Sequence, residues 1–134
     1  MNIKILAILS GSLLIGSCTQ DTASKEKEQE VHKVEQERER LKLKNAAFCA
    51  CMGHGSVLMK KAMEDDGSVA AYVENSDYGM EAFEAVFEAA SVYADTVYRS
   101  KYNRSLTVMK CLDFYHSREL QELVKKYDGD LIAE

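Results

Sequence analysis

Cysteine and histidine are the residues of this chain whose types and spacing could do chemistry. His54 follows Cys51 by three residues, and His116 follows Cys111 by five. A thiolate beside an imidazole could form a nucleophilic dyad, and Cys49, Cys51, His54 and His116 together could ligate zinc. However, zinc sites usually draw on C-x₂-C or H-x₃-H pairs, which the sequence lacks, as it lacks a Gly-rich phosphate loop and a nucleophile elbow. We therefore predict no catalytic residue, no metal and no cofactor, and a protein that binds rather than an enzyme.

The first residues predict export and lipidation. Residues 1–17 read as a signal peptide, with Lys4 ahead of an apolar run over 5–15 that is too short to span a bilayer. The run ends in I-G-S-C, which resembles a lipobox, so Cys18 would carry the lipid. An ordinary secretory signal is the alternative, but an A-x-A-like cleavage site is missing. Because Thr19 rather than Asp follows, we expect a periplasmic protein anchored in the outer membrane more than in the inner one.

Composition divides the rest of the chain into a tether and a domain. Residues 18–44 form the lipidated tether and a charged spacer, in which Val31, Val34 and Leu41 recur at helical spacing. We interpret it as a solvated helix, because two heptads are too few to predict a coiled coil. Residues 45–134 form the domain proper. The chain has no proline and only 7 glycines among 134 residues, which favours helices throughout.

Apolar side chains recur at helical spacing in five segments of this domain. The stripes are Phe48, Cys51, Gly55, Leu58, Met59 and Ala62 within 45–64; Val69, Tyr72 and Val73 after Ser68; Phe83, Val86, Phe87, Ala90, Tyr93, Ala94 and Val97; Val108, Cys111, Leu112 and Tyr115; and Leu120, Leu123, Val124 and Tyr127. Turns are expected at 65–67, 75–79 and 102–104, and Ser117 is expected to cap the last helix. No segment alternates with a period of two. The predicted fold is all-α: a compact bundle of about five helices held by one disulfide, preceded by the signal peptide and the charged spacer.

Helical geometry selects the disulfide. The periplasm is oxidising, and Cys51 and Cys111 each lie on a core stripe. Cys49 is two residues from Cys51, about 200° round the helix, so it faces away from that core. A Cys49–Cys51 bridge would strain a helix and join nothing else. We predict a Cys51–Cys111 disulfide, worth about 4 kcal/mol for a loop of this length, and leave Cys49 as a free thiol or a dimer contact.

Acidic residues dominate the middle of the chain. The span from Ala62 to Tyr98 contains nine acids and neither Lys nor Arg. The acids are Glu64, Asp65, Asp66, Glu74, Asp77, Glu81, Glu84, Glu88 and Asp95. Such a face repels nucleic acid and anionic lipid and attracts a basic partner. We expect partner contacts in its turns, through Asp65, Asp66, Gly67, Asn75, Ser76, Asp77 and the aromatic anchor Tyr78.

The segment KCLDFYHSRELQELVKKY, residues 110–127, resembles the C-terminal signature of type VI secretion amidase immunity proteins, the class that neutralises the fourth class of amidase effector. The residues that carry the likeness are Lys110, Cys111, Leu112, Asp113, Tyr115, His116, Ser117, Glu119 and Leu120. We expect Cys111, Leu112, Leu120 and Leu123 to build the core and cap. Cys51 stands where the family has its first-helix cysteine. The likeness spans about residues 45–128 and is loose in the middle, where partner choice would reside.

The resemblance implies an all-helical periplasmic protein that is commonly dimeric. It implies a papain-like secreted peptidoglycan amidase as partner, with a protruding loop of the immunity protein blocking the active-site cleft, and it agrees with the Cys51–Cys111 pairing. The lipidation site and the charged spacer depart from the family pattern. Two other functions fit the composition: a structural or self-associating envelope lipoprotein, and a periplasmic inhibitor of lysozyme-like enzymes.

Overall fold

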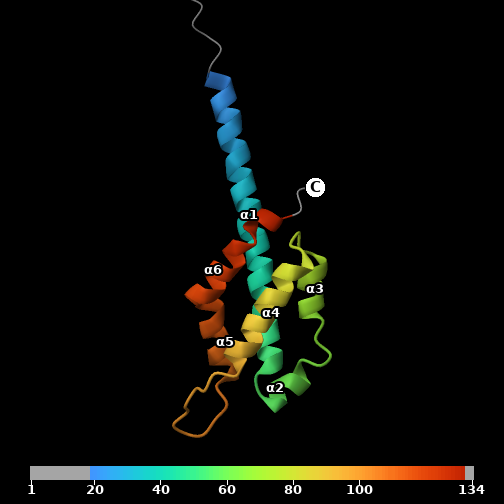
Figure 1. Cartoon of the computed structure of the whole chain (residues 1–134), viewed down its shortest axis with the longest axis vertical. Helices are drawn as coiled ribbons and strands as arrows, with labels where there is room; N and C mark the ends of the chain where they lie inside the picture. Colours follow the sequence, from blue (N-terminus) through green and yellow to red (C-terminus); the bar gives the residue numbers. More distant parts are fainter. Residues whose placement is uncertain (1–18, 132–134) are drawn as a thin grey trace, which may run out of the picture. The chain divides into compact units, whose positions relative to one another are not determined.

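The computed structural model describes residues 19–131, with side chains from Ser24 onward. Helices are the only regular secondary structure in this range (Figure 1). They are α1 (Thr19–His54), α2 (Val57–Ala62), α3 (Ser68–Glu74), α4 (Met80–Ala94), α5 (Thr107–His116), α6 (Arg118–Lys126) and the short 3-10 helix η1 (Asp128–Asp130). The predicted all-α fold with one disulfide is confirmed. The predicted signal peptide and the lipidation site at Cys18 lie outside the described residues.

The chain divides into two units, Met1–His32 and Lys33–Glu134. In the first, the described part belongs to the start of α1, and its described side chains are all exposed. None of the described helices is long and apolar enough to cross a membrane. The second unit holds the hydrophobic core.

The bounds of helix α1 differ from those predicted for the first helix of the domain. It runs through Asn45 without a break and ends at His54, whereas a helix over 45–64 was expected. Ser56 then caps a separate helix, α2, by accepting a hydrogen bond from the Met59 backbone N–H at 3.3 Å. Glu39 and Leu43, expected in a solvated spacer, are fully buried. Their burial could not be predicted from the charged composition of the spacer, because two inward-facing residues among many exposed ones make no clear apolar stripe.

Gly55 lies at the break between α1 and α2 and permits a close contact. A Cβ atom added there would stand 2.0 Å from Cγ2 of Thr107 at the start of α5. Only glycine lets the backbone approach that helix so closely. The backbone at this corner therefore packs directly against α5.

Helix α4 supplies the centre of the core and packs against α5 and α6. The predicted stripe is confirmed at Phe83, Val86, Ala90 and Ala94, which are buried, whereas Val97 lies beyond the end of the helix and is exposed. The facing helices contribute Cys111, Phe114, Leu120, Val124 and Tyr127. The predicted cap of the last helix is also observed: the hydroxyl of Ser117 accepts from the Leu120 backbone N–H at 3.1 Å.

The predicted disulfide is present between Cys51 of α1 and Cys111 of α5, with both residues fully buried. Cys49 is free and half-buried. Burial raises the pKa of its thiol, and the nearby carboxylate of Asp66 raises it further. The raised pKa keeps the Cys49 thiol mostly protonated. Cys51 is in the disulfide, so Cys51 has no thiolate to offer to a Cys–His dyad or a zinc site.

Candidate partner-binding surface

The first predicted contact turn, Asp65–Gly67, lies between α2 and α3 and is exposed. Asp66 shapes this turn, because its carboxylate accepts a hydrogen bond from the Ser68 backbone N–H at 2.9 Å. The hydrogen bonds from Ser68 hold the pKa of the Asp66 carboxyl below its usual value. The other acids of the Ala62–Tyr98 span also lie at the surface, eight of the nine exposed and Asp77 half-buried.

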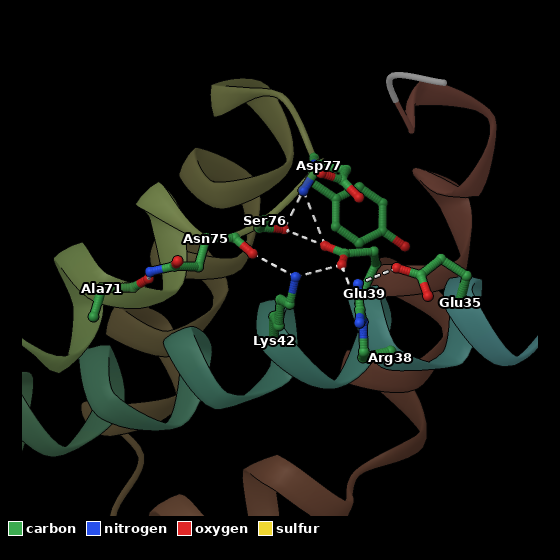
Figure 2. A network of polar contacts seen from close by, with 9 residues as sticks. Glu35, Arg38, Glu39, Lys42, Ala71, Asn75, Ser76 and Asp77 are labelled. Carbon is green, nitrogen blue, oxygen red and sulfur yellow. Dashed lines mark hydrogen bonds and ion pairs between the residues drawn. The ribbon is translucent and has the colours of Figure 1, made fainter. Parts of the chain in front are cut away.

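The second predicted turn, Asn75–Tyr78, is held from inside by the buried Glu39 of α1 (Figure 2). The Glu39 carboxylate accepts hydrogen bonds from the Ser76 hydroxyl at 3.0 Å and from the Asp77 backbone N–H at 2.9 Å. Lys42 pairs with the same carboxylate at 2.5 Å and also donates to the Asn75 carbonyl. Three consecutive residues, Asn75 to Asp77, are thereby tied to one helix, two of them through backbone atoms.

Burial alone raises the pKa of the Glu39 carboxyl. The hydrogen bonds from Lys42, the Asp77 N–H and Ser76 outweigh that effect, so the pKa is lowered and the group stays ionised. Carboxylate oxygens of Glu35, Glu39 and Asp77 come within 4.8 Å of one another. Since Glu39 is already bonded to Lys42, Ser76 and the Asp77 N–H, this cluster is a structural network.

Tyr78, expected as an exposed anchor, is only 4% exposed, so that prediction is wrong. Its hydroxyl donates to Asp128 at 3.2 Å, and Arg40 of α1 pairs with the same carboxylate, at 2.7 Å from its Nε. Burial, followed by the Asp128 charge, raises the pKa of Tyr78, while the Arg40 hydrogen bond lowers the pKa of Asp128. The polar neighbours of Tyr78 in the sequence suggested exposure, but the ring closes the core beneath the turn.

A projecting loop, only part of which was predicted from the sequence, joins α4 to α5 (Figure 1). It spans residues 95–106, of which only 102–104 were expected as a turn. Its tip carries three exposed cations, Arg99, Lys101 and Arg104, and Tyr102, which is 76% exposed. Asn103 adopts a left-handed conformation with φ 52°, and its N–H bonds to the Ser100 carbonyl at 3.2 Å. A change from acids to cations where the apolar stripe stops was the signal that could have revealed it.

An apolar groove of about 580 Å³ lies between α2 and α5, beside this loop. Its walls are Ser56, Leu58, Met59, Ser105, Leu106, Thr107, Val108, Met109, Leu112 and Asp113. Leu58, Val108 and Leu112 were expected on core stripes and are instead 77%, 50% and 45% exposed. Periodicity placed them on the apolar side of their helices, but no neighbouring helix covers that side.

The signature residues have several different roles. Cys111 and Leu120 are in the core and Ser117 caps α6, as expected, whereas Leu112 lines the groove. The ring of Tyr115 meets Phe48 edge-on at 6.1 Å and the Lys44 ammonium at 4.3 Å, so it joins α5 to α1. His116 ends α5 and Glu119 lies in the first turn of α6, and both are exposed. Lys110 and Asp113 face the 95–106 loop.

These observations define a class: a small all-helical domain, held by a buried disulfide, with a projecting loop, an apolar groove and a surface-exposed acidic stretch. The family model Tai4, described as type VI secretion system (T6SS) amidase immunity protein, matches residues 42–124. This match covers more than half of the chain, and the chain belongs to that family. The resemblance drawn from residues 110–127 is thereby confirmed. No curated protein matches the chain.

Proposed function

We propose that this protein binds and inhibits a type VI secreted peptidoglycan amidase in the periplasm, and so protects the cell from its own and its siblings' toxin. The family match over residues 42–124 carries this proposal. The structure supports it by offering recognition surfaces on a rigid core. A papain-like amidase is the expected partner, because that is the enzyme implied by the signature resemblance.

We further propose that the 95–106 loop enters the active-site cleft of the amidase. It is the longest non-helical segment between described helices, and Val97 and Tyr102 are 86% and 76% exposed at its surface. Exposed aromatic and apolar side chains of this kind commonly carry binding energy once they are buried in a partner's pocket. The Asp65–Gly67 turn and the acids of α4 would meet a basic rim and accelerate encounter.

A neutralisation assay tests the function. The amidase effector of the same secretion system is exported to the periplasm of a test cell, with or without residues 19–134 of this chain exported beside it. Rescue from lysis together with a co-purifying complex is the expected result. A catalytically inactive amidase provides the control for lysis. Continued lysis in cells that contain the folded, oxidised protein contradicts the proposal and leaves the lysozyme-inhibitor and structural-lipoprotein functions to be tested with added lysozyme.

Two sets of variants separate the contact surfaces. Val97→Ala with Tyr102→Ala removes apolar contacts from the loop, and Asp65→Lys with Asp66→Lys reverses charge on the turn. Truncating a buried aromatic anchor commonly costs about 2 kcal/mol or more, roughly thirtyfold in Kd. The charge reversal should mainly slow association. Val34→Ala, at an exposed apolar residue of α1 outside both proposed contact surfaces, is the matched control. Equal affinity of the loop variant and this control would remove the loop from the interface.

We also propose that the protein is a homodimer anchored by lipid on Cys18. The family resemblance supports the homodimer, and the lipobox-like sequence of residues 15–18 supports the lipid anchor. Cys18→Ser should abolish incorporation of labelled palmitate and release the protein from the membrane fraction. Light scattering on the exported domain, with Cys49→Ser as a comparison, measures the oligomeric state and any contribution of the free thiol.

A further inference from the structure

Two residues of the 110–127 signature, Lys110 and Asp113, lie outside the core and contact the loop between α4 and α5. Their neighbours in the sequence, Cys111 and Phe114, are buried in the core. Lys110 itself is half-buried, and Asp113 is exposed. Packing therefore explains Cys111 and Phe114 but leaves the charged pair without a role.

Lys110 forms a hydrogen bond with the C-terminal end of α4. Its ammonium donates to the carbonyl of Ala94 at 2.5 Å, and Ala94 is the last residue of α4. Carbonyls in the last turn of a helix lack partners within that helix, and a cation there also suits the helix dipole. Lys110 thus fixes the residue from which the loop departs.

Asp113 holds the next part of the loop. Its carboxylate accepts a hydrogen bond from the Tyr98 hydroxyl at 2.9 Å, and the Tyr93 hydroxyl lies 3.4 Å from the same Tyr98 oxygen. The Tyr93 ring packs on Phe114, with centroids 4.9 Å apart, so this small network rests on the core. The Lys110 ammonium lies 5.9 Å from the centre of the Tyr98 ring. Both charged residues therefore act on the same segment, 94–98.

The far end of the loop is fixed independently. The hydroxyls of Ser105 and Thr107 are 2.8 Å apart, and Thr107 is buried against Gly55. The tip between these fixed ends carries the exposed cations and Tyr102. A loop held at both ends loses less conformational entropy on binding than a free one.

We infer that Lys110 and Asp113 are positioning residues for effector binding: through Ala94 and Tyr98 they fix the departing end of the 95–106 loop, so that its tip is presented in one orientation. This inference rests on the proposed function, in which the loop meets the amidase.

Trypsin provides a readout that needs no effector, because the loop itself contains Arg99, Lys101 and Arg104. The variants are Lys110→Met, which keeps the aliphatic stem, Asp113→Ala, and Asp113→Asn, whose amide oxygen still accepts from Tyr98. Lys33→Met and Asp130→Ala change exposed residues outside the loop, its contacts and the acidic span, and they serve as matched controls. Cleavage in the loop is followed on reducing gels, thermal unfolding is measured alongside, and association with the purified amidase is measured by surface plasmon resonance.

Loss of one hydrogen bond at the loop should raise the initial cleavage rate roughly two- to tenfold. We expect that increase in Lys110→Met and Asp113→Ala, with weaker amidase binding by a similar factor and little change in Tm, while Asp113→Asn stays near the wild type. Unchanged cleavage in both variants overturns the inference, and so does faster cleavage with wild-type affinity. If the wild-type protein itself fails to bind the amidase, the proposed function fails and the effector role falls with it, while the cleavage rates still decide whether these residues hold the loop.

Discussion

At the residue scale, Glu39 connects α1 to the turn before α4 through a buried carboxylate. Glu39→Ala would leave the Ser76 hydroxyl, the Asp77 N–H and the Lys42 ammonium without this acceptor. We expect a loss of about 3 kcal/mol in the free energy of unfolding, measured by urea denaturation at neutral pH. Glu35→Ala is the control, since Glu35 pairs with the exposed Arg38 and should change stability by less than about 1 kcal/mol. Equal losses in the two variants would show that the network does not support the turn.

The same carboxylate predicts a pH dependence. Its pKa is lowered in the folded protein from an ordinary value of 4.5, so the folded state binds fewer protons than the unfolded state around that pH. The stabilisation is fully present above pH 4.5 and is lost as the pH falls through the lowered value. The stability difference between wild type and Glu39→Gln should thus be constant near neutral pH and shrink below 4.5. Asp128 also titrates at low pH but is common to both proteins, so a difference that persists undiminished in acid would contradict the assignment to Glu39.

Gly55 gives a prediction of steric origin. Gly55→Ala places a methyl group 2.0 Å from Thr107 Cγ2, inside any tolerable contact distance. Overpacking of this kind should cost about 1–3 kcal/mol, visible as a lower Tm. Thr107→Ser removes the clashing methyl, so the double variant should recover most of the loss relative to Thr107→Ser alone. Gly67→Ala is the control, because nothing lies within 4 Å of a Cβ there. If Gly55→Ala is as stable as Gly67→Ala, α1 and α5 do not pack as closely as described.

At the scale of the elements, the disulfide joins α1 to α5 across 60 residues. Crosslinking a loop of this length is worth about 4 kcal/mol, a large part of the stability of a small domain. Reduction, or the double substitution Cys51→Ala with Cys111→Ala, should lower Tm by well over about 10 °C. Cys49→Ser leaves the bridge intact and should unfold at nearly the wild-type temperature. A reduced protein as stable as the oxidised one would mean that helix packing alone holds α5 in place.

The elements that the sequence predicted well are those whose apolar stripe meets a partner. Phe83, Val86 and Ala90 repeat with the helical period and are buried, and the same geometry selected the disulfide. Periodicity shows which side of a helix is apolar, but it does not show whether another helix covers that side, so Leu58 and Leu112 were misplaced. The network around Glu39 was not predictable, because it joins residues 37 and 38 positions apart within stretches that read as solvated.

At the scale of the whole molecule, charge is segregated along the chain. All charged residues in the span from Ala62 to Tyr98 are acidic, and the cations Arg99, Lys101 and Arg104 follow directly. Glu81→Gln, Glu84→Gln and Glu88→Gln together remove three charges from exposed positions of α4. We expect slower association with the amidase and a weaker dependence of the association rate on ionic strength, because long-range attraction is screened by salt. Stopped-flow kinetics at several salt concentrations measures both.

Glu119→Gln, Glu122→Gln and Asp130→Asn together form the matched control for this experiment. They remove the same number of charges from exposed positions outside the acidic span. If both triple variants lose equal amounts of association rate, net charge rather than the acidic face governs the encounter.

The placement of the disulfide also determines what a protease can achieve. The bond closes a ring that contains every residue from Met52 to Lys110, and this ring includes the Asp65–Gly67 turn, the Asn75–Tyr78 turn and the 95–106 loop. A single cut anywhere in the ring opens it but leaves one covalent molecule, whose two ends remain joined at Cys51 and Cys111. In an oxidising compartment, a nicked protein therefore keeps both halves of the bundle together, and the damage becomes a loss of fragments only when the bridge is reduced.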